Sequence, residues 1–187
     1  HGHQAIVERD AGQGIGASDD DYVRAGATIA ATASEVWAKA QMIVKVKEPQ
    51  AAERALLKPG QLLFTYLHLA PDPAQTKDLV AGGAICIAYE TVEDSLGRLP
   101  LLAPMSEIAG KLATQSGAYM MEKPMGGRGL LLGGVPGVAA ANVMVIGGGV
   151  VGMNAAMIAI GMQADVFVFD QSIPRLRELD NIFDGRA

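Results

Sequence analysis

The chain has 187 residues, a formal net charge of −5 at pH 7 and a composition that is 50% hydrophobic and 19% charged. This length and this apolar fraction predict a globular protein of one or two domains and exclude an intrinsically disordered chain. The acidic balance argues against nucleic acid as the main partner. No CxxC or HExxH spacing is present, so we predict no metal site, and we interpret the single cysteine, Cys86, as a buried thiol.

Strand-like and helix-like segments alternate over the first hundred residues, which predicts a mostly parallel sheet with helices on both faces. Ser18 can cap a helix over 19–25, and Thr32 and Glu35 have capping-box spacing at the start of a helix through Ala40. The other expected helices are 50–57 and 73–81, and the expected strands are 4–7, 42–46, 62–67 and 84–88.

A long helix is expected from Ser106 to about Glu122, where Pro124 and the glycines after it end the helix. We divide the chain accordingly into an α/β domain over 1–105, a linking helix over 106–125 and a second α/β domain over 126–187.

Residues 142–170 have the spacing of a dinucleotide-binding strand–turn–helix–strand unit. An apolar strand over 143–146 leads into the glycine-rich stretch 147–152, a helix-like run follows, and a second apolar strand over 166–169 ends at Asp170. A purely structural glycine turn is the alternative, but the strand before it and the acid after it favour nucleotide binding.

Each residue of this unit has an expected task. Gly147 permits the tight turn, Gly149 lets a pyrophosphate approach the backbone, and Gly152 lets the helix pack closely on the strand. Asp170 lies 23 positions after Gly147, where a carboxylate can accept hydrogen bonds from ribose hydroxyls. Because a carboxylate repels a 2′-phosphate, NAD is favoured over NADP, although Arg175 is near enough to leave NADP open.

The stretch 129–164 carries no charged residue, which raises the question of a membrane span. Its many glycines and Pro136 divide it into strand, turn and helix, as in a buried parallel strand unit, so we predict no transmembrane segment. The first residues also lack the pattern of a signal peptide, and we predict a soluble, cytoplasmic protein with no membrane partner.

Three polar residues follow successive predicted strands: Lys47, His68 and Glu90. In parallel sheets functional groups collect beyond the carboxyl ends of the strands. A lysine there can neutralise a carboxylate or polarise a carbonyl, and a histidine can transfer a proton near neutral pH. Solvated or structural roles remain the alternatives. Ser106 can cap its helix or meet the cofactor.

Several segments, in this order and spacing, resemble alanine dehydrogenase, and the resemblance extends over essentially the whole chain. They are KVKEP (45–49), LFTYLHLA (63–70), AYETVE (88–93), LPLLAPMSEIAGK (99–111), GGRGLLLGGVPGV (126–138) and VIGGGVVG (145–152).

The resemblance implies two α/β domains separated by a cleft, the second a Rossmann-type fold, usually assembled as a hexamer. It implies reversible NAD-dependent oxidative deamination of L-alanine to pyruvate and ammonia. By resemblance, 1–105 is the substrate domain and 126–187 the NAD domain, Lys47 binds the substrate and His68 is the catalytic acid/base. Ser106, Val150, Asp170 and Arg175 match positions that contact NAD.

A Rossmann domain has about six strands, and fewer are present here, so we expect the sequence to be a segment of a larger enzyme. The family's N-terminal substrate arginine and a catalytic aspartate of the later NAD domain are expected outside it, and the segment alone is expected to be inactive. Two alternatives remain. One is the nucleotide-binding subunit of proton-translocating transhydrogenase, where the histidine has no catalytic task, and the other is a non-catalytic truncated homologue.

Overall fold

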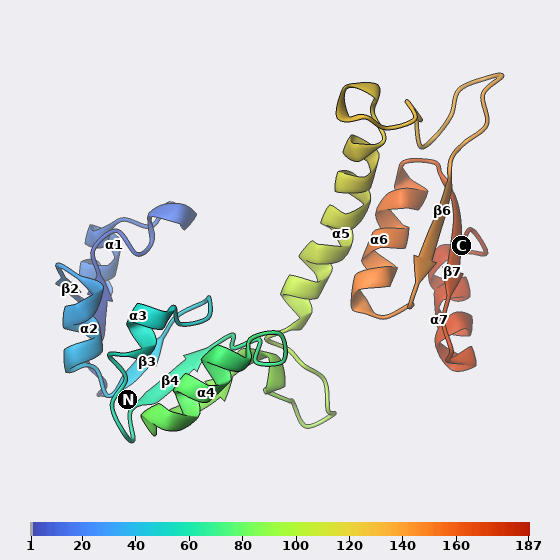
Figure 1. Ribbon diagram of the computed structural model, residues 1–187. Coiled ribbons are helices and arrows are strands. Elements are labelled where there is room, and N and C mark those ends of the chain that lie inside the picture. Colours follow the sequence, from blue (N-terminus) through green and yellow to red (C-terminus); the bar gives the residue numbers. More distant parts are fainter. Residues whose placement is uncertain (1) are drawn as a thin grey trace. The chain divides into compact units, whose positions relative to one another are not determined.

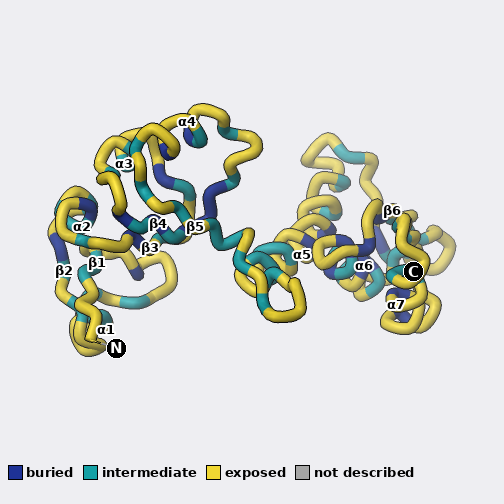
Figure 2. Tube along the Cα trace, turned by 90° about the horizontal axis from the view of Figure 1, so that it is seen from below, coloured by how far each residue is buried: buried dark blue, intermediate teal, exposed yellow. Residues whose placement is uncertain are grey.

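The computed structural model describes residues 2–187, and the chain divides at residues 93 and 94 into two compact units (Figure 1). Each unit contains at least one pair of parallel strands and its own hydrophobic core, and the buried residues collect separately within each (Figure 2). Every strand pair in the described residues is parallel, as the alternation of strands and helices predicted.

The first unit contains two groups of strands. β1 (Ile6–Glu8) pairs with β2 (Thr28–Ala30). β3 (Met42–Val44), β4 (Leu62–Thr65) and β5 (Ile85–Ala88) form a second sheet in that order. β2 is not among the strands that the sequence predicted.

β3 and β4 each end two residues earlier than predicted, but their pairing continues past their ends. The N–H of Lys45 donates to the carbonyl of Phe64 at 3.2 Å, and the N–H of Tyr66 donates to the carbonyl of Val46 at 3.2 Å. The segments after β3 and β4 therefore still run side by side where the predicted functional residues begin.

The helices of the first unit are α1 (Asp19–Arg24), α2 (Ala33–Lys39), α3 (Ala51–Arg54) and α4 (Pro73–Gly82), with short 3-10 turns at η1 (Gln13–Ile15) and η2 (Tyr89–Thr91). The predicted caps are confirmed: Ser18 accepts from the N–H of Asp21, and Thr32 from that of Glu35. α3 is shorter than the predicted 50–57, because the chain tightens into i→i−3 turns before Pro59.

The core of the first unit lies on one face of the β3–β4–β5 sheet. It is a cluster of Trp37, Ile43, Leu63, Leu67 and Leu79. Helices on both faces were expected, and for this sheet, within residues 2–187, that expectation is wrong. The strand order advances in one direction, so right-handed crossovers place α3 and α4 on the same face. The opposite face leaves Val44 and Ile85 more than half exposed.

The second unit contains α5 (Ala103–Met120), the 3-10 turn η3 (Lys123–Met125), β6 (Asn142–Ile146), α6 (Val150–Gly161), β7 (Asp165–Phe169) and α7 (Ile173–Phe183). The predicted strand–turn–helix–strand unit is thus confirmed as β6–α6–β7 (Figure 1). Its core is formed by Val145, Ala156, Ala159, Val166, Leu179 and Phe183, which places α6 and α7 on the same face of the two strands.

Helix α5 packs against α6 along a line of small residues. The hydroxyl of Thr114 donates to the carbonyl of Ala155 at 2.8 Å, and a Cβ on Gly110 would lie 2.2 Å from the carbonyl oxygen of Val151. α5 begins at Ala103 and not at Ser106, because Pro104 fits the first helical turn, where its missing N–H costs nothing.

Within residues 2–187 the structure has no helix that is both long and apolar enough to cross a membrane.

We predict that Gly110→Ala destabilises the protein by about 1–3 kcal/mol, because the new methyl group has to displace the α6 backbone. Gly117→Ala is the matched control on the same helix. A Cβ at Gly117 meets no atom within 4 Å, so relief of glycine's helix penalty should stabilise by about 0.5–1 kcal/mol. Urea unfolding followed by circular dichroism measures both, and equal effects of the two changes would contradict the close approach.

Candidate functional site

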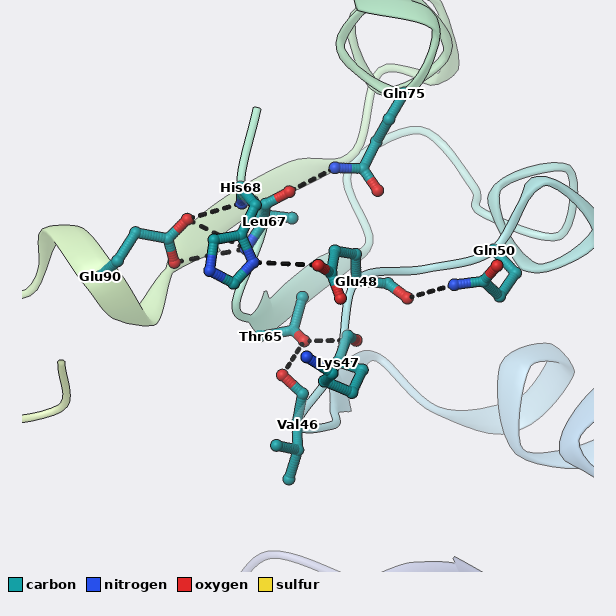
Figure 3. A network of polar contacts seen from close by, with 9 residues as sticks. All are labelled: Val46, Lys47, Glu48, Gln50, Thr65, Leu67, His68, Gln75 and Glu90. Carbon is teal, nitrogen blue, oxygen red and sulfur yellow. Dashed lines mark hydrogen bonds and ion pairs between the residues drawn. The ribbon is translucent and has the colours of Figure 1, made fainter. Parts of the chain in front are cut away.

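The carboxyl ends of β3, β4 and β5 carry the polar residues that the sequence singled out in the first unit. Lys47 follows β3, His68 follows β4 and Glu90 lies in η2, directly after β5 (Figure 3). The parallel register pairs Val44 with Phe64 and Thr65 with Ala88, so all three ends reach the same edge of the sheet. The structure therefore brings these residues together, as the strand-end argument predicted.

His68 is held in a defined orientation by its neighbours. Its Nδ1 lies 3.0 Å from Oε1 of Glu48, and its ring stacks on that of Tyr66 with centroids 5.9 Å apart. The His68 side chain is 38% exposed, so it is accessible to a small molecule. Because Nδ1 is engaged by a carboxylate, Nε2 is the ring nitrogen available for proton exchange.

Glu48 was not identified from the sequence, although its place directly after Lys47 at the same strand end could have indicated it. Its hydrogen bond with its own backbone N–H, reinforced by His68 and the nearby charge of Lys47, holds the pKa of Glu48 below its usual value against the opposing effect of burial. Glu48 is therefore ionised at neutral pH and acts as the acceptor, which places the shared hydrogen on Nδ1 of His68.

The chain segment that carries Lys47 is anchored by a fully buried hydroxyl. Oγ1 of Thr65 lies 3.1 Å from the carbonyl oxygen of Val46 and 2.8 Å from that of Lys47. The Lys47 side chain is exposed, whereas nearby Lys45 pairs with Glu53 at 2.6 Å. The backbone is thus fixed while the Lys47 ammonium stays accessible to an anion or a carbonyl oxygen.

The glycine-rich turn of the second unit has the conformation that its sequence requires. Gly147 has φ of 94° and donates its N–H to the carbonyl of Phe169 at 2.7 Å, which closes the turn out of β6. A Cβ on Gly152 would lie 1.8 Å from the carbonyl oxygen of Gly147, so the start of α6 lies directly against the turn. At Gly149, the residue before α6, a Cβ would meet no atom within 4 Å.

Asp170 and Arg175 hold the peptide groups of Gly148 from both sides. Oδ2 of Asp170 accepts from the N–H of Gly148 at 2.7 Å, and Nε of Arg175 donates to its carbonyl at 2.6 Å. Hydrogen bonds from the N–H groups of Ser172 and Gly148 lower the pKa of Asp170. A carboxylate has about four lone-pair positions, so Asp170 retains acceptor capacity beyond these backbone hydrogen bonds.

A groove of about 780 Å³ in the second unit runs beside β6, α5 and the start of α6. The predicted residues that line it are Ser106, Gly147, Gly149, Val150 and Gly152. Ser106 is thus inside α5 and beside the glycine turn, and it is not the cap of its helix. Asp170 borders a separate hollow with Gly147 and Phe169.

The turn fits the pyrophosphate and ribose of a dinucleotide on three counts. The space at Gly149 is open, the N-terminus of α6 faces the turn, and the carboxylate of Asp170 can accept further hydrogen bonds.

Among residues 2–187 no group of three or more His, Cys, Asp or Glu side chains is arranged to hold a metal ion. Cys86 was expected to be a buried thiol, but it is only partly buried, and this burial raises the pKa of its thiol.

Comparison with known proteins gives two family matches that together cover almost the whole chain. The family described as Alanine dehydrogenase/PNT, N-terminal domain, matches residues 1–109, and the one described as Alanine dehydrogenase/PNT, C-terminal domain, matches residues 113–187. An alanine dehydrogenase of Halomonas elongata is 57% identical over 185 residues, which are 99% of this chain and 50% of that protein. The chain spans about half the length of the curated relatives it matches.

Two solved structures show the same fold. One, an L-alanine dehydrogenase, is 50% identical to this chain with a TM-score of 0.88, and the alignment covers 100% of this chain and 51% of the L-alanine dehydrogenase chain. The other, a transhydrogenase from Sinorhizobium meliloti, is 24% identical with a TM-score of 0.76, and the alignment covers 97% of this chain and 54% of the transhydrogenase chain. At this identity the likeness shows a shared fold alone.

Two glycines of the turn should respond differently to the same substitution. Gly152→Ala forces a methyl group onto the Gly147 carbonyl and should cost about 3 kcal/mol or more. Gly149→Ala meets open space and should change stability by less than about 1 kcal/mol, yet weaken NADH binding roughly tenfold or more, equivalent to about 1.4 kcal/mol. Urea unfolding and NADH titration in the full-length protein separate the two effects. Unchanged NADH affinity in Gly149→Ala would contradict the expected approach of the pyrophosphate.

Proposed function

The chain belongs to the alanine dehydrogenase/PNT family, and from this we propose that it forms the substrate-binding part and the start of the nucleotide-binding part of an NAD-dependent alanine dehydrogenase. The proposed reaction is the reversible oxidative deamination of L-alanine to pyruvate and ammonia. One observation supports it above the others: His68, oriented through Nδ1 by Glu48, stands at the strand ends beside the accessible Lys47.

We assign the substrate to the first unit. Lys47 is proposed to hold the substrate carboxylate or the carbonyl oxygen of pyruvate, where its ammonium stabilises the charge that develops. Its exposed side chain on an anchored backbone suits this task. The expected domain division, with 1–105 for the substrate, 106–125 as linking helix and 126–187 for NAD, is retained as part of the proposal.

His68 is proposed as the acid/base. In the deamination direction the α-carbon of alanine loses a hydride and the amine becomes an imine. Nε2 of His68 takes a proton from the water that adds to the imine, and it returns a proton as the carbinolamine releases ammonia. The Nδ1 contact with Glu48 stabilises the imidazolium that forms between these steps.

NAD, when bound, supplies the hydride acceptor. The residues proposed to hold it are Ser106, Gly147, Gly149, Val150, Gly152, Asp170 and Arg175. The pyrophosphate is assigned to the turn and the N-terminus of α6, and the adenosine ribose to Asp170. Arg175 already donates to Gly148 and pairs with Glu178 at 2.6 Å, so its guanidinium is engaged within the unit, which supports NAD over NADP.

The transhydrogenase alternative is less well supported. Hydride exchange between two nucleotides requires no proton-transferring histidine, whereas His68 is partly exposed and paired with Glu48. The solved L-alanine dehydrogenase is also twice as similar in sequence as the transhydrogenase, at 50% against 24% identity. A non-catalytic homologue is supported less again, because the turn and Asp170 retain the groups that dinucleotide binding needs. By family resemblance, we also propose that the full-length enzyme is a hexamer and lies in the cytoplasm.

We expect His68→Ala to lower kcat for alanine oxidation roughly 10²- to 10⁴-fold, the usual contribution of a general acid/base. The dissociation constant of NADH should stay at the wild-type value, because His68 and the glycine turn lie in different units. Steady-state assay and NADH fluorescence titration in the full-length protein measure the two quantities, with His3→Ala, also an exposed histidine, as the control. Near-normal turnover by His68→Ala would remove the assignment.

Asp170→Asn should weaken NADH binding roughly 10- to 100-fold, because hydrogen bonds to a charged acceptor contribute about 1.5–3 kcal/mol. NADPH binding should weaken less or improve, since the repulsion of its 2′-phosphate is removed. Titration with both nucleotides gives the ratio of the two affinities, and Asp165→Asn at the exposed start of β7 is the control. An unchanged NADH/NADPH ratio would contradict contact of Asp170 with the ribose.

A further inference from the structure

Glu90 makes an unusual set of contacts for a carboxylate at a strand end. Its Oε1 accepts from the N–H of His68 at 2.7 Å and from the N–H of Leu67 at 3.1 Å, and its Oε2 lies 3.3 Å from the N–H of Leu67 (Figure 3). One side chain therefore receives two successive backbone donors directly after β4. Within residues 2–187, neither N–H donates to a backbone carbonyl of a neighbouring strand.

The two donor N–H groups lie where the backbone adopts a strained conformation, at His68. His68 has φ of 46°, in the left-handed region that residues other than glycine rarely adopt. Such a residue persists only where its surroundings fix it. The carbonyl of Leu67 is held as well, by Nε2 of the buried Gln75 from α4.

The short turn that carries Glu90 is fixed by the packing of its neighbour Tyr89. Glu90 lies in η2, and the neighbouring Tyr89 packs edge to face on Phe64 and Tyr66, with ring centroids 4.3 and 4.9 Å away. The register that pairs Thr65 with Ala88 sets the distance from β5 to the segment after β4. The backbone that carries the Glu90 carboxylate is therefore fixed relative to Leu67 and His68.

We propose that Glu90 is a positioning residue for His68: its carboxylate holds the Leu67 and His68 N–H groups, so that His68 keeps the left-handed backbone which turns its imidazole toward Glu48. The inference rests on the proposed function for its effect on turnover. Two carboxylates then divide the task, since Glu90 fixes the backbone of His68 and Glu48 fixes its ring.

The test compares Glu90→Ala with Glu90→Gln in the full-length protein. Glu90→Ala removes both acceptors and should lower kcat for alanine roughly 10- to 100-fold, as a small misplacement of a reacting group does, with NADH affinity unchanged. Glu90→Gln retains an oxygen that can take the place of Oε1 and should stay within about threefold of wild type. The exposed Glu93, three residues further on, gives the control Glu93→Ala.

A double-mutant cycle shows whether Glu90 acts through His68. In a His68→Ala background, Glu90→Ala should cause no further loss of residual activity. Equal losses in both backgrounds would overturn the proposal, as would wild-type kcat in Glu90→Ala. If Glu90→Ala does not fold, Glu90→Asp replaces it, because this shorter carboxylate keeps the charge but reaches the N–H groups less well and should give an intermediate loss; wild-type kcat there would equally overturn the proposal.

A readout independent of turnover separates this inference from the proposed function. Imidazole ¹⁵N shifts should show His68 protonated at Nδ1 in the wild type and a mixture of tautomers in Glu90→Ala. A shift change with no alanine-oxidising activity in any variant would disprove the proposed function and retain the positioning role. Unchanged shifts in Glu90→Ala would disprove the positioning role.

Discussion

The parallel register of β3, β4 and β5 is the constraint on which the candidate site of the first unit depends. Parallel strands end at one edge, so three residues that are 21 to 43 positions apart in the chain meet there: Lys47, His68 and Glu90. The buried hydroxyl of Thr65 extends the pairing one step further, because it ties the carbonyl of Lys47 to β4 after the strand itself has ended. A slip of one residue would turn every side chain to the opposite face and separate the lysine from the histidine.

The backbone turns after β6 and after β4 are stabilised in different ways. After β6 the chain turns at Gly147, where a positive φ costs little because no Cβ is present. After β4 it turns at His68, where the same region is unfavourable, and three side chains from different elements hold the backbone and ring in place: Glu48, Gln75 and Glu90. In the first case the sequence makes the turn easy. In the second, the chemistry expected of an imidazole requires a residue that the turn disfavours, and the cost is met by hydrogen bonds around it.

This difference explains how far the sequence could predict the molecule. The β6–α6–β7 unit, the caps at Ser18 and Thr32 and the family resemblance were predicted correctly, because glycine spacing, capping residues and motifs act locally. The roles of Glu48 and Glu90 were not foreseen, since they follow from strand register and from the φ of His68, which no short pattern encodes. The start of α5 was placed three residues late because Ser106 resembles a cap, while Pro104 already occupies the first turn. The roles of Lys47, His68 and the NAD-binding residues stay predictions.

The peptide groups of Gly148 are held between Asp170 and Arg175, two side chains of the same unit, so the turn is fixed by contacts within the chain itself. Ordering a loop on binding costs conformational entropy, and here that entropy is lost when the protein folds. The proposed dinucleotide therefore binds to a turn that the fold already orders, and its affinity is not lowered by the entropy cost of ordering that turn. The same contacts make the turn a shared element of folding and recognition, so a substitution that loosens it lowers the affinity and the stability together.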